Sequence, residues 1–497
     1  MMRPLPQLDP SAPLPLYRQL YEYFRGAIKS GDMPAGFRLP ATRELAGLLG
    51  LNRTTVSSAY DLLVSEGLIS GQVGRGSFVA GEPGPSGAGR TERLDWDLLL
   101  GPSSEPAASP QAPLGEMVSF ASSRPSAGLF PMEAVRRVCE EVLTGPRAAS
   151  ILQLGSPGGY EPLRQFLLEE ARRSGDASPS DDLMITSGCQ QAFDLLQRAL
   201  VPPGETVVME DPVYPGLKNL FRLAGANLAG APVGPDGISL EHLRHAIEKT
   251  RPRMLIVTPN FQNPTGATLP LPARHAVLDL AARSGVVLVE NDIYGDLRYT
   301  GEPLPTLKRM GGSPDTVLLR SFSKVAFPGL RVGWAIGPAA LIARLREIKQ
   351  VTDLHTDQLS QAVMLRFAES GRLAEHTARM RAAGTERLAA TLAGCRDGLP
   401  VGTRFTRPEG GMNLWVRLPE PLDAGDLLPK VQRERVTYLP GSYFTVSRHE
   451  PGGLRLSFAG LEPEKIRKGI AVLGEVVRNE LLGRPASRSF EPAPAMV

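Results

Sequence analysis

Cysteine is scarce in this chain of 497 residues, which has only Cys139, Cys189 and Cys395. The three lie far apart and none belongs to a C-x-x-C pair. This pattern argues against a disulfide framework and against a structural zinc site, and it fits a reducing cytoplasm. Histidine is equally scarce, with six residues. His242 and His245 lie three apart on an expected helix and are interpreted as solvated, so no metal site is expected.

Long apolar runs are also missing. No stretch of about eighteen apolar residues occurs, so no transmembrane helix is expected. The N-terminal sequence MMRPLPQLDPSAP lacks the apolar centre of a signal peptide. A strong excess of charge is missing as well, since the net charge is +3. So small an excess does not indicate nucleic-acid binding, although basic residues gathered in one place would still allow it.

Composition divides the chain into three parts. Residues 13–80 carry helical signals followed by a Gly-rich hairpin, and residues 81–116 are rich in Pro, Gly and Ser, which predicts a linker. Residues 117–480 alternate helical stretches with short, β-branched apolar runs. Because these runs show no polar alternation, they predict strands covered on both faces, in an α/β domain with a mostly parallel sheet. The expected strands are 183–186, 206–210, 254–258, 286–290, 316–321 and 332–337.

Residues 13–80 predict a winged helix-turn-helix. Apolar residues at helical spacing predict helices over 15–29 and 41–49. A third helix is expected over 53–66, with Asn52 as its N-cap. The Gly-rich sequence LISGQVGRGSFVAG then predicts two short strands joined by a turn.

Polar and basic residues gather at the start of the third expected helix. Recognition helices contact base edges there, and backbone N–H groups favour phosphate at the same end. A small helical cap with solvated arginines is the alternative interpretation. The run LPATRELAGLLGLNRTTVSSAYDLLVSEGLI, followed by GRGSFV, resembles the DNA-binding domain of the GntR family of bacterial regulators. The resemblance implies a DNA interface with the wing near the minor groove. The candidate DNA-binding residues are Arg43, Arg53, Thr54, Thr55, Gly74 and Arg75.

The most informative string of the third part is SFSKVAFPGLRVGW, in which Lys324 follows an expected strand. A lysine in such a place can form a Schiff base with an aldehyde cofactor. The hydroxyls of Ser321 and Ser323, together with Arg331, suit a phosphate group.

Three further strings also follow expected strands. Asp292 lies in VVLVENDIYGDLRY, where a carboxylate can keep a pyridine nitrogen protonated. Asn263 lies in TPNFQNPTG, where its amide can donate to a phenolate oxygen. In TSGCQQAFDLL, the residues Ser187, Gly188 and Cys189 open a helix whose amides can hold a phosphate. A turn, a helix cap or a solvated lysine would explain each string alone, but their succession at strand ends predicts one ligand site.

Residues 117–480 resemble the fold-type I aminotransferases, which use pyridoxal 5′-phosphate and have a smaller C-terminal lobe. The resemblance implies that Lys324 joins the cofactor aldehyde and that Asp292 lies at the ring nitrogen. It also implies Asn263 and Tyr294 at the phenolic oxygen and Tyr214 stacked on the ring. The residues implied to hold the phosphate are Ser187, Gly188, Cys189, Ser321, Ser323 and Arg331.

Arg455, in GGLRLSFA, matches the family's arginine that grips a substrate carboxylate. A surface arginine is the alternative, but Leu454 and Leu456 are expected on the other face of a short strand. Two residues depart from the family pattern. Leu154 stands where a tyrosine usually reaches the partner subunit's phosphate, and Ser123 stands where a glycine is common beside the carboxylate. Both departures put efficient transamination in doubt.

A GntR-like domain, a linker and an aminotransferase-like domain, in this order, resemble the MocR subfamily of transcription regulators. The resemblance implies a cytoplasmic homodimer that binds promoter DNA and no membrane. It also implies that a small amino compound is sensed as an effector by exchange at the Lys324 aldimine. Two alternatives stay open: a pyridoxal-phosphate-dependent aminotransferase with a helical appendage, and a DNA-binding protein whose second domain is only a dimerisation scaffold.

Overall fold

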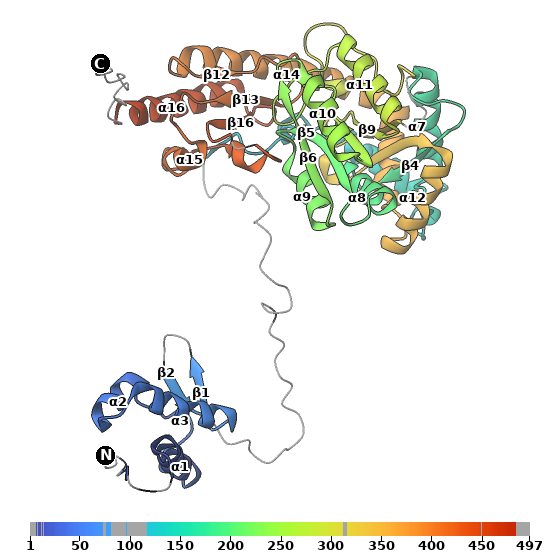
Figure 1. The fold of residues 1–497 in the computed structure, drawn as a ribbon. Helices are drawn as coiled ribbons and strands as arrows, with labels where there is room; N and C mark the ends of the chain where they lie inside the picture. The colour runs from blue at the N-terminus through green and yellow to red at the C-terminus, as the bar shows by residue number, and fades with distance from the viewer. Residues whose placement is uncertain are drawn as a thin grey trace. The chain divides into compact units, whose positions relative to one another are not determined.

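The computed structural model divides into two units, Met1–Ser103 and Ser104–Val497 (Figure 1). The residues that it describes are 6, 8–10, 12, 14–72, 76–80, 96, 117–311, 316–448 and 450–483. Apart from Trp96, the predicted linker 81–116 lies outside the described residues. The same holds for the predicted wing residues Gly74 and Arg75.

The N-terminal unit has the predicted three helices and β-wing. Its core is formed by side chains from all three helices and from the hairpin, among them Leu20, Leu45, Val56 and Val79. Residues 37–39 also pair with the second strand of the wing, since Leu39 N donates to Ser77 O over 2.9 Å. The elements are α1 Leu16–Lys29, α2 Thr42–Leu49, α3 Arg53–Ser65, β1 Ile69–Gln72 and β2 Gly76–Val79.

Helix α3 begins where the sequence predicted, because Asn52 caps it. The backbone of Asn52 is extended and its side-chain oxygen accepts from Thr54 N over 3.1 Å. Val56 and Leu63 are fully buried against the core. Arg53 and Thr54, at the start of the helix, are exposed.

The second unit contains an eight-stranded sheet of order β4-β11-β10-β9-β8-β5-β6-β7. The central pairs, from β10 through β9, β8 and β5 to β6, are parallel, whereas β11 and β7 pair antiparallel with their neighbours. The prediction of a mostly parallel sheet is confirmed. The strands are β4 Asp181–Thr186, β5 Thr206–Asp211, β6 Asn227–Gly234, β7 Gly237–Ile238, β8 Met254–Val257, β9 Val287–Asn291, β10 Thr316–Ser321 and β11 Gly333–Pro338.

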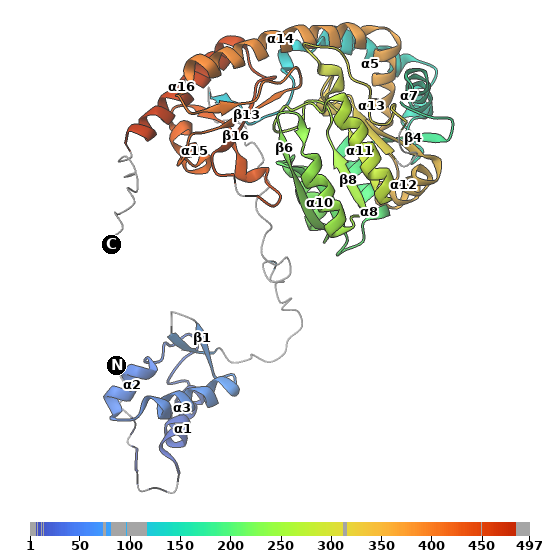
Figure 2. The ribbon, with the colours of Figure 1, turned by 45° about the horizontal axis from the view of Figure 1, so that its top comes forward.

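Helices cover both faces of this sheet (Figures 1 and 2), which explains why its strands are almost uniformly apolar. One face packs against α8 Cys189–Leu200, α9 Pro215–Leu223 and α12 Ala339–Thr352. The other face packs against α7 Glu161–Ser174, α10 Leu240–Thr250, α11 Leu271–Ser284 and α13 Gln358–Glu369. Two further helices, α5 Met132–Thr144 and α6 Ala148–Ile151, precede α7.

A smaller lobe follows, as the sequence predicted. Its antiparallel sheet has the order β12-β13-β16-β15, and Val118 and Ser119 of β3 pair in parallel with β14 of the same lobe. The long helix α14 carries Met380 in the core of the large lobe and Leu388 in that of the small lobe (Figure 2). The elements are β3 Val118–Ser119, α14 Arg372–Gly398, β12 Arg404–Phe405, β13 Asn413–Arg417, α15 Ala424–Arg433, β14 Val436–Thr437, β15 Leu439–Pro440, β16 Gly453–Ser457 and α16 Pro463–Leu482.

Replacing the cap of α3 tests how that helix is held. We expect Asn52→Ala to lower the free energy of unfolding of the N-terminal unit by about 1 kcal/mol, because Thr54 N loses its acceptor. Hydrogen exchange of the α3 amides in the full chain measures the change. Asn52→Asp keeps a side-chain acceptor and serves as the control, so an equal loss in both variants would contradict the capping role.

Candidate functional site

The predicted site residues come together at one edge of the large sheet. Lys324 follows β10, Asp292 follows β9, and Asn263 lies in the segment after β8. Tyr214 follows β5, and Ser187 follows β4. Since all five strands point the same way, their carboxyl ends meet at this edge, where open α/β sheets bind ligands.

Lys324 lies beside buried hydroxyls that have no partner. Its Nζ donates to Ser123 O over 2.7 Å and lies 5.6 Å from the centre of the Tyr294 ring. Tyr294 is 1% exposed, and the hydroxyls of Tyr294 and Ser123 have no hydrogen-bond partner among the described residues. Buried hydroxyls without partners cost free energy, so this arrangement suits a polar ligand next to Lys324.

Asp292 is held from two sides. Asn260 Nδ2 donates to its Oδ1 over 2.8 Å, and Arg320 donates to its Oδ2 from Nε over 3.2 Å and from Nη2 over 2.9 Å. Asn260 is itself fixed by Arg274, whose Nη2 donates to Asn260 Oδ1 over 2.6 Å. Burial opposes the charge of Arg320, but the carboxylates of Asp292 and Asp296 outweigh it and raise the pKa of Arg320. The Asp292 carboxylate is therefore fixed in orientation and paired with a permanent cation.

The segment from Ser187 to Cys189 meets Arg331. Gly188 has φ +76°, and a Cβ atom there would overlap the Arg331 guanidinium. Arg331 Nη2 donates to Ser187 O over 3.1 Å, and the hydroxyls of Ser321 and Ser323 lie 2.9 Å apart. Backbone amides at the start of α8, two hydroxyls and one guanidinium therefore surround a position suited to a phosphate.

Cys189 fits a packing role better than a reactive one. Its thiol donates to Arg320 O over 3.4 Å, and burial raises the pKa of Cys189 to about 12. The thiol is therefore protonated at neutral pH, and the thiolate is the form that would react.

Arg455 lies inside the small lobe's sheet, so the surface alternative is wrong. It is 3% exposed, Leu454 and Leu456 point into the opposite core, and its guanidinium lies 5.0 Å from the Phe444 ring centre. Its Nη1 donates to Asn263 Oδ1 over 3.0 Å, and its Nη2 donates to Ala121 O.

The charge of Arg455 has no carboxylate partner in the described part of the chain. Burial lowers the pKa of Arg455 to about 10, which still leaves the guanidinium charged at neutral pH. None of the residues described by the structure accepts a hydrogen bond from Arg455 Nε. A buried cation without a counter-charge favours an anionic ligand group at this position.

Sequence reasoning missed several residues of this site. Asn260 and Arg320 hold Asp292, and Arg320 had a visible signal as the only charged residue in the strand TVLLRS. Asn413 was missed too. It is 1% exposed, both polar atoms of its side chain lack partners among the residues that the structure describes, and it shares with Arg455 one face of the β13–β16 pair.

The candidate DNA-binding residues of the described N-terminal unit lie on its surface. Arg43, Arg53 and Thr54 are exposed, and Thr55 is half-buried. Sequence reasoning missed Arg38, which is exposed and whose Nε lies 3.3 Å from the place of a Cβ on Gly76. No local pattern predicted that Arg38 lies at the wing, because only the pairing of residues 37–39 with β2 brings it there.

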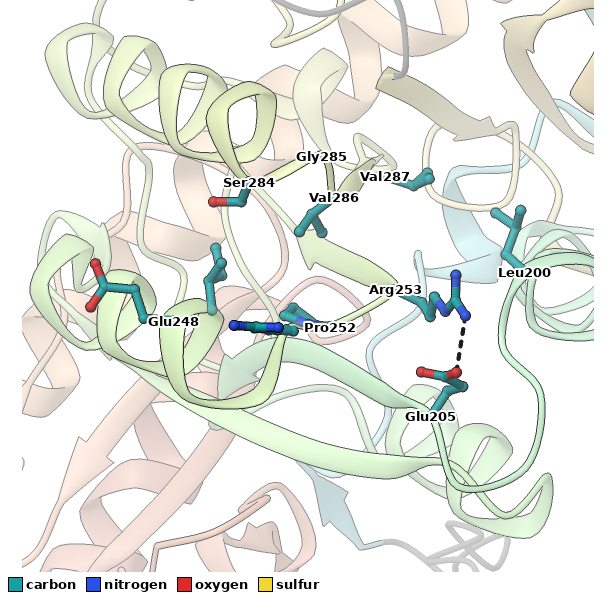
Figure 3. A pocket seen from close by; sticks show the side chains of 11 residues that line it. Leu200, Glu205, Glu248, Pro252, Arg253, Ser284, Gly285, Val286 and Val287 are labelled. Carbon is teal, nitrogen blue, oxygen red and sulfur yellow. Dashed lines mark hydrogen bonds and ion pairs between the residues drawn. The ribbon is translucent and has the colours of Figure 1, made fainter.

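A separate hollow of about 610 Å³ lies at the opposite edge of the large sheet (Figure 3). The starts of β8 and β9 and the ends of α10 and α11 surround it, and Arg253 pairs there with Glu205 over 3.1 Å. None of the predicted site residues lines it. In the described parts of the chain, no group of three metal-ligating side chains occurs, and no helix has the length and apolar character to cross a membrane.

The residues around Lys324 fit pyridoxal 5′-phosphate. The ligand needs an amine for its aldehyde, a carboxylate near its ring nitrogen and donors for its phosphate. Lys324, Asp292 and the Gly188–Arg331 cradle offer these groups. The unpaired hydroxyl of Tyr294 offers a donor beside them.

Two family descriptions match the chain. Residues 16–79 match "Bacterial regulatory proteins, gntR family", and residues 125–473 match "Aminotransferase class I and II". The chain therefore belongs to the pyridoxal-phosphate-dependent aminotransferase class I and II family and carries a GntR-type helix-turn-helix domain in front. The resemblances to both families and the cofactor predicted from them are confirmed.

Whole-chain similarity narrows the class to regulators like MocR. The "Probable rhizopine catabolism regulatory protein MocR" of Rhizobium meliloti is 30% identical over 93% of this chain and 94% of its own length. "Aromatic-amino-acid aminotransferase 1" of Thermococcus litoralis is 35% identical over 74% of this chain and 89% of its own. The α-aminoadipate aminotransferase LysN of Thermus thermophilus, complexed with N-(5′-phosphopyridoxyl)-L-leucine, has 35% identity and a TM-score of 0.70. It covers 75% of this chain and 96% of its own. The chain is thus a MocR-like, GntR-type regulator fused to an aminotransferase domain.

A single methyl group tests the cradle. We expect Gly188→Ala to weaken pyridoxal 5′-phosphate binding at least about tenfold, because the new Cβ displaces Arg331 and φ is positive there. Titration of the absorbance of the bound cofactor measures the affinity. Gly329→Ala, where a Cβ meets open space, is the matched control and should leave the affinity unchanged. Equal affinity of the Gly188→Ala variant and the unmodified protein would contradict the cradle.

Proposed function

We propose that this protein is a transcription regulator that binds promoter DNA through residues 13–80 and senses a small amino compound through residues 117–480. The observation that carries the proposal is the presence, in one chain, of an exposed recognition helix and a buried site centred on Lys324. The same order of domains in MocR, whose printed name is that of a regulatory protein, supports it. Promoter DNA lies in the cytoplasm, which is where we expect the protein to act.

For the DNA-binding half, the start of α3 is the proposed reading surface. Arg53 and Thr54 are exposed at the helix N-terminus, where side chains reach base edges and amides favour phosphate. Arg43 on α2 lies on the surface of the same unit. We assign Arg53 to base contact and Arg43 to base or phosphate contact, because arginine suits both. Thr55 is assigned to the same surface, as are Gly74 and Arg75, which lie outside the described residues.

For the sensing half, this chain's own residues bind and orient the ligand. Pyridoxal 5′-phosphate, when bound, supplies an aldehyde that joins reversibly to amines. Lys324 is the resident amine with which an incoming amino compound competes, and Asp292, Asn263, Tyr294 and Tyr214 orient the ring. The residues that hold the phosphate are Ser187, Gly188, Cys189, Ser321, Ser323 and Arg331.

Arg455 selects the effector. Its guanidinium is buried, charged and without a carboxylate partner in the described ranges of the chain, so we expect the effector to carry a carboxylate beside its amine. Residues 121–123 contact both Arg455 and Lys324, since Ala121 O accepts from Arg455 and Ser123 O accepts from Lys324. We therefore expect the Ser123 side chain to limit the space for the effector. The effector is therefore a compact amino acid or a related amino compound.

The signal requires two arrangements of the protein with different affinities for the effector. We propose that Arg455 gives up its hydrogen bonds to Asn263 and Ala121 when it binds the carboxylate of the effector. The small lobe then moves, and this movement alters DNA binding. The resemblance to fold-type I aminotransferases supports a homodimer, in which two recognition helices would contact two half-sites.

A second candidate is a true aminotransferase. The likeness to the aromatic-amino-acid aminotransferase of Thermococcus litoralis favours it, as does the presence of Lys324, Asp292 and Asn263 at one edge. Rapid turnover of an amino donor and a 2-oxo acid, together with no binding to the promoter DNA of the protein's own gene, would establish it instead of the regulator.

Two single substitutions test the regulator, because they separate its halves. We expect Lys324→Ala to remove the absorbance of the lysine-bound cofactor and leave DNA affinity within about threefold. We expect Arg53→Ala to weaken binding to promoter DNA by about 1–3 kcal/mol, if Arg53 makes a bidentate base contact, and to leave the absorbance unchanged. Fluorescence anisotropy of labelled promoter DNA and absorbance spectra measure the two properties.

Lys29→Ala is the matched control for Arg53→Ala, since it removes one exposed cation from the end of α1 instead of the start of α3. Lys29→Ala should change the free energy of DNA binding by less than half of the change expected for Arg53→Ala. Loss of both properties in either test variant would overturn the proposal that the two halves are separable.

A further inference from the structure

Arg320 is the unexpected residue of the site. It lies in β10, where the other side chains are apolar or small hydroxyls, and its side chain is 25% exposed. Nε and Nη2 of its guanidinium both donate to Oδ2 of Asp292, whose side chain is 1% exposed. Asp296 lies further away, at 3.8 Å. The main partner of Arg320 is therefore the carboxylate assigned to the cofactor ring nitrogen.

The strand register fixes this pair in place. Leu319 of β10 pairs with Asn291 of β9, so the next residue on each strand is Arg320 and Asp292. Asp292 N also donates to Leu319 O over 3.0 Å. The backbone pairing of β9 with β10 therefore fixes the positions of Asp292 and Arg320 in addition to the ion pair between their side chains.

The charge of Arg320 has a direct consequence for the ring nitrogen. A lone carboxylate favours a protonated nitrogen, because opposite charges attract. Guanidinium keeps its charge at all physiological pH values, so it offsets the field of Asp292 and repels a second positive charge nearby. A ring nitrogen that is protonated less often draws fewer electrons from an attached amino compound, and the α-proton of that compound is then less acidic.

We propose that Arg320, by sharing the Asp292 carboxylate, lets the site bind amino compounds reversibly while slowing the removal of their α-proton. Arg320 is thus a positioning residue that favours sensing over transamination. The inference rests on the proposed function, because it takes Asp292 to face the ring nitrogen.

The slowed reaction is the first half of a transamination, and its atoms balance with one water molecule from the solvent. The amino group passes from the amino acid to the cofactor carbon that was joined to Lys324, and the Lys324 amine is released. The α-hydrogen is transferred as a proton to the same cofactor carbon, and the water molecule supplies the oxygen of the 2-oxo acid. No external oxidant or reductant takes part.

Two substitutions separate the charge of Arg320 from its hydrogen bonds. Arg320→Gln keeps a donor near Asp292 and removes the charge, whereas Arg320→Lys keeps the charge and removes the planar fork. We mix each cofactor-loaded full-length protein with L-alanine or L-glutamate and follow the bound cofactor's absorbance as the aldehyde form becomes the amine form. The expected result is conversion at least about tenfold faster in Arg320→Gln than in the unmodified protein, and within about threefold of it in Arg320→Lys.

A second readout excludes a merely structural role. The pH at which the absorbance of the bound cofactor changes should differ from that of the unmodified protein in Arg320→Gln. In Arg320→Lys it should equal that of the unmodified protein. Arg387→Gln is the matched control, because it breaks a different arginine–carboxylate pair, in which buried Arg387 contacts exposed Glu462 over 2.7 Å. It should leave both the conversion rate and the pH profile unchanged.

A double substitution tests whether Arg320 acts through Asp292. In an Asp292→Asn background, Arg320→Gln should no longer accelerate conversion, since the shared carboxylate is gone. Equal conversion rates in Arg320→Gln and the unmodified protein would overturn the inference, even where amino compounds still change DNA binding. Faster conversion in Arg320→Gln, with no amino compound affecting DNA binding, would instead support the inference and refute the sensing function.

Discussion

Parallel pairing of β5, β8, β9 and β10 is the constraint on which the site depends. Residues as distant in sequence as Tyr214 and Lys324 lie at one edge of the sheet because the strands that precede them end there. The pairing also has a fixed register, and a shift by one residue would turn the side chains that follow each strand to the other face. The apolar helices on both faces hold that register through burial, so the packing of the core is also what gives the site its geometry.

The two sides of the site differ in how their charges are satisfied. On the side of the large lobe, Asp292 has an amide and a guanidinium, so its charge is balanced without any ligand. On the side of the small lobe, Arg455 has a carbonyl, an amide oxygen and an aromatic ring, but no carboxylate among the described residues. An anionic ligand group would therefore find an unpaired cation on the small lobe and a paired one, Arg320, on the large lobe.

Much of the fold was readable from the sequence, since buried parallel strands and a capped recognition helix both leave local patterns. The strand ends at Lys324, Asp292 and Asn263 followed from those patterns, and the family resemblance supplied their suggested roles. The partners of Asp292 were not readable in the same way. Asn260 reaches it from the segment after β8 and Arg320 reaches it from β10, and such contacts depend on register, which no local pattern encodes. Asn413 was hidden for a similar reason, because an amide inside a strand shows its lack of partners only after packing.

The pairing of β3 with β14 determines which lobe holds the first described residues of the second unit. Val118 and Ser119 follow Met117, the first described residue after the predicted linker apart from Trp96. They pair through backbone hydrogen bonds with β14 of the small lobe and not with the large sheet. The described part of the second unit therefore begins on the lobe that holds Arg455. Any displacement of this lobe relative to the large sheet would displace Val118 and Ser119 with it.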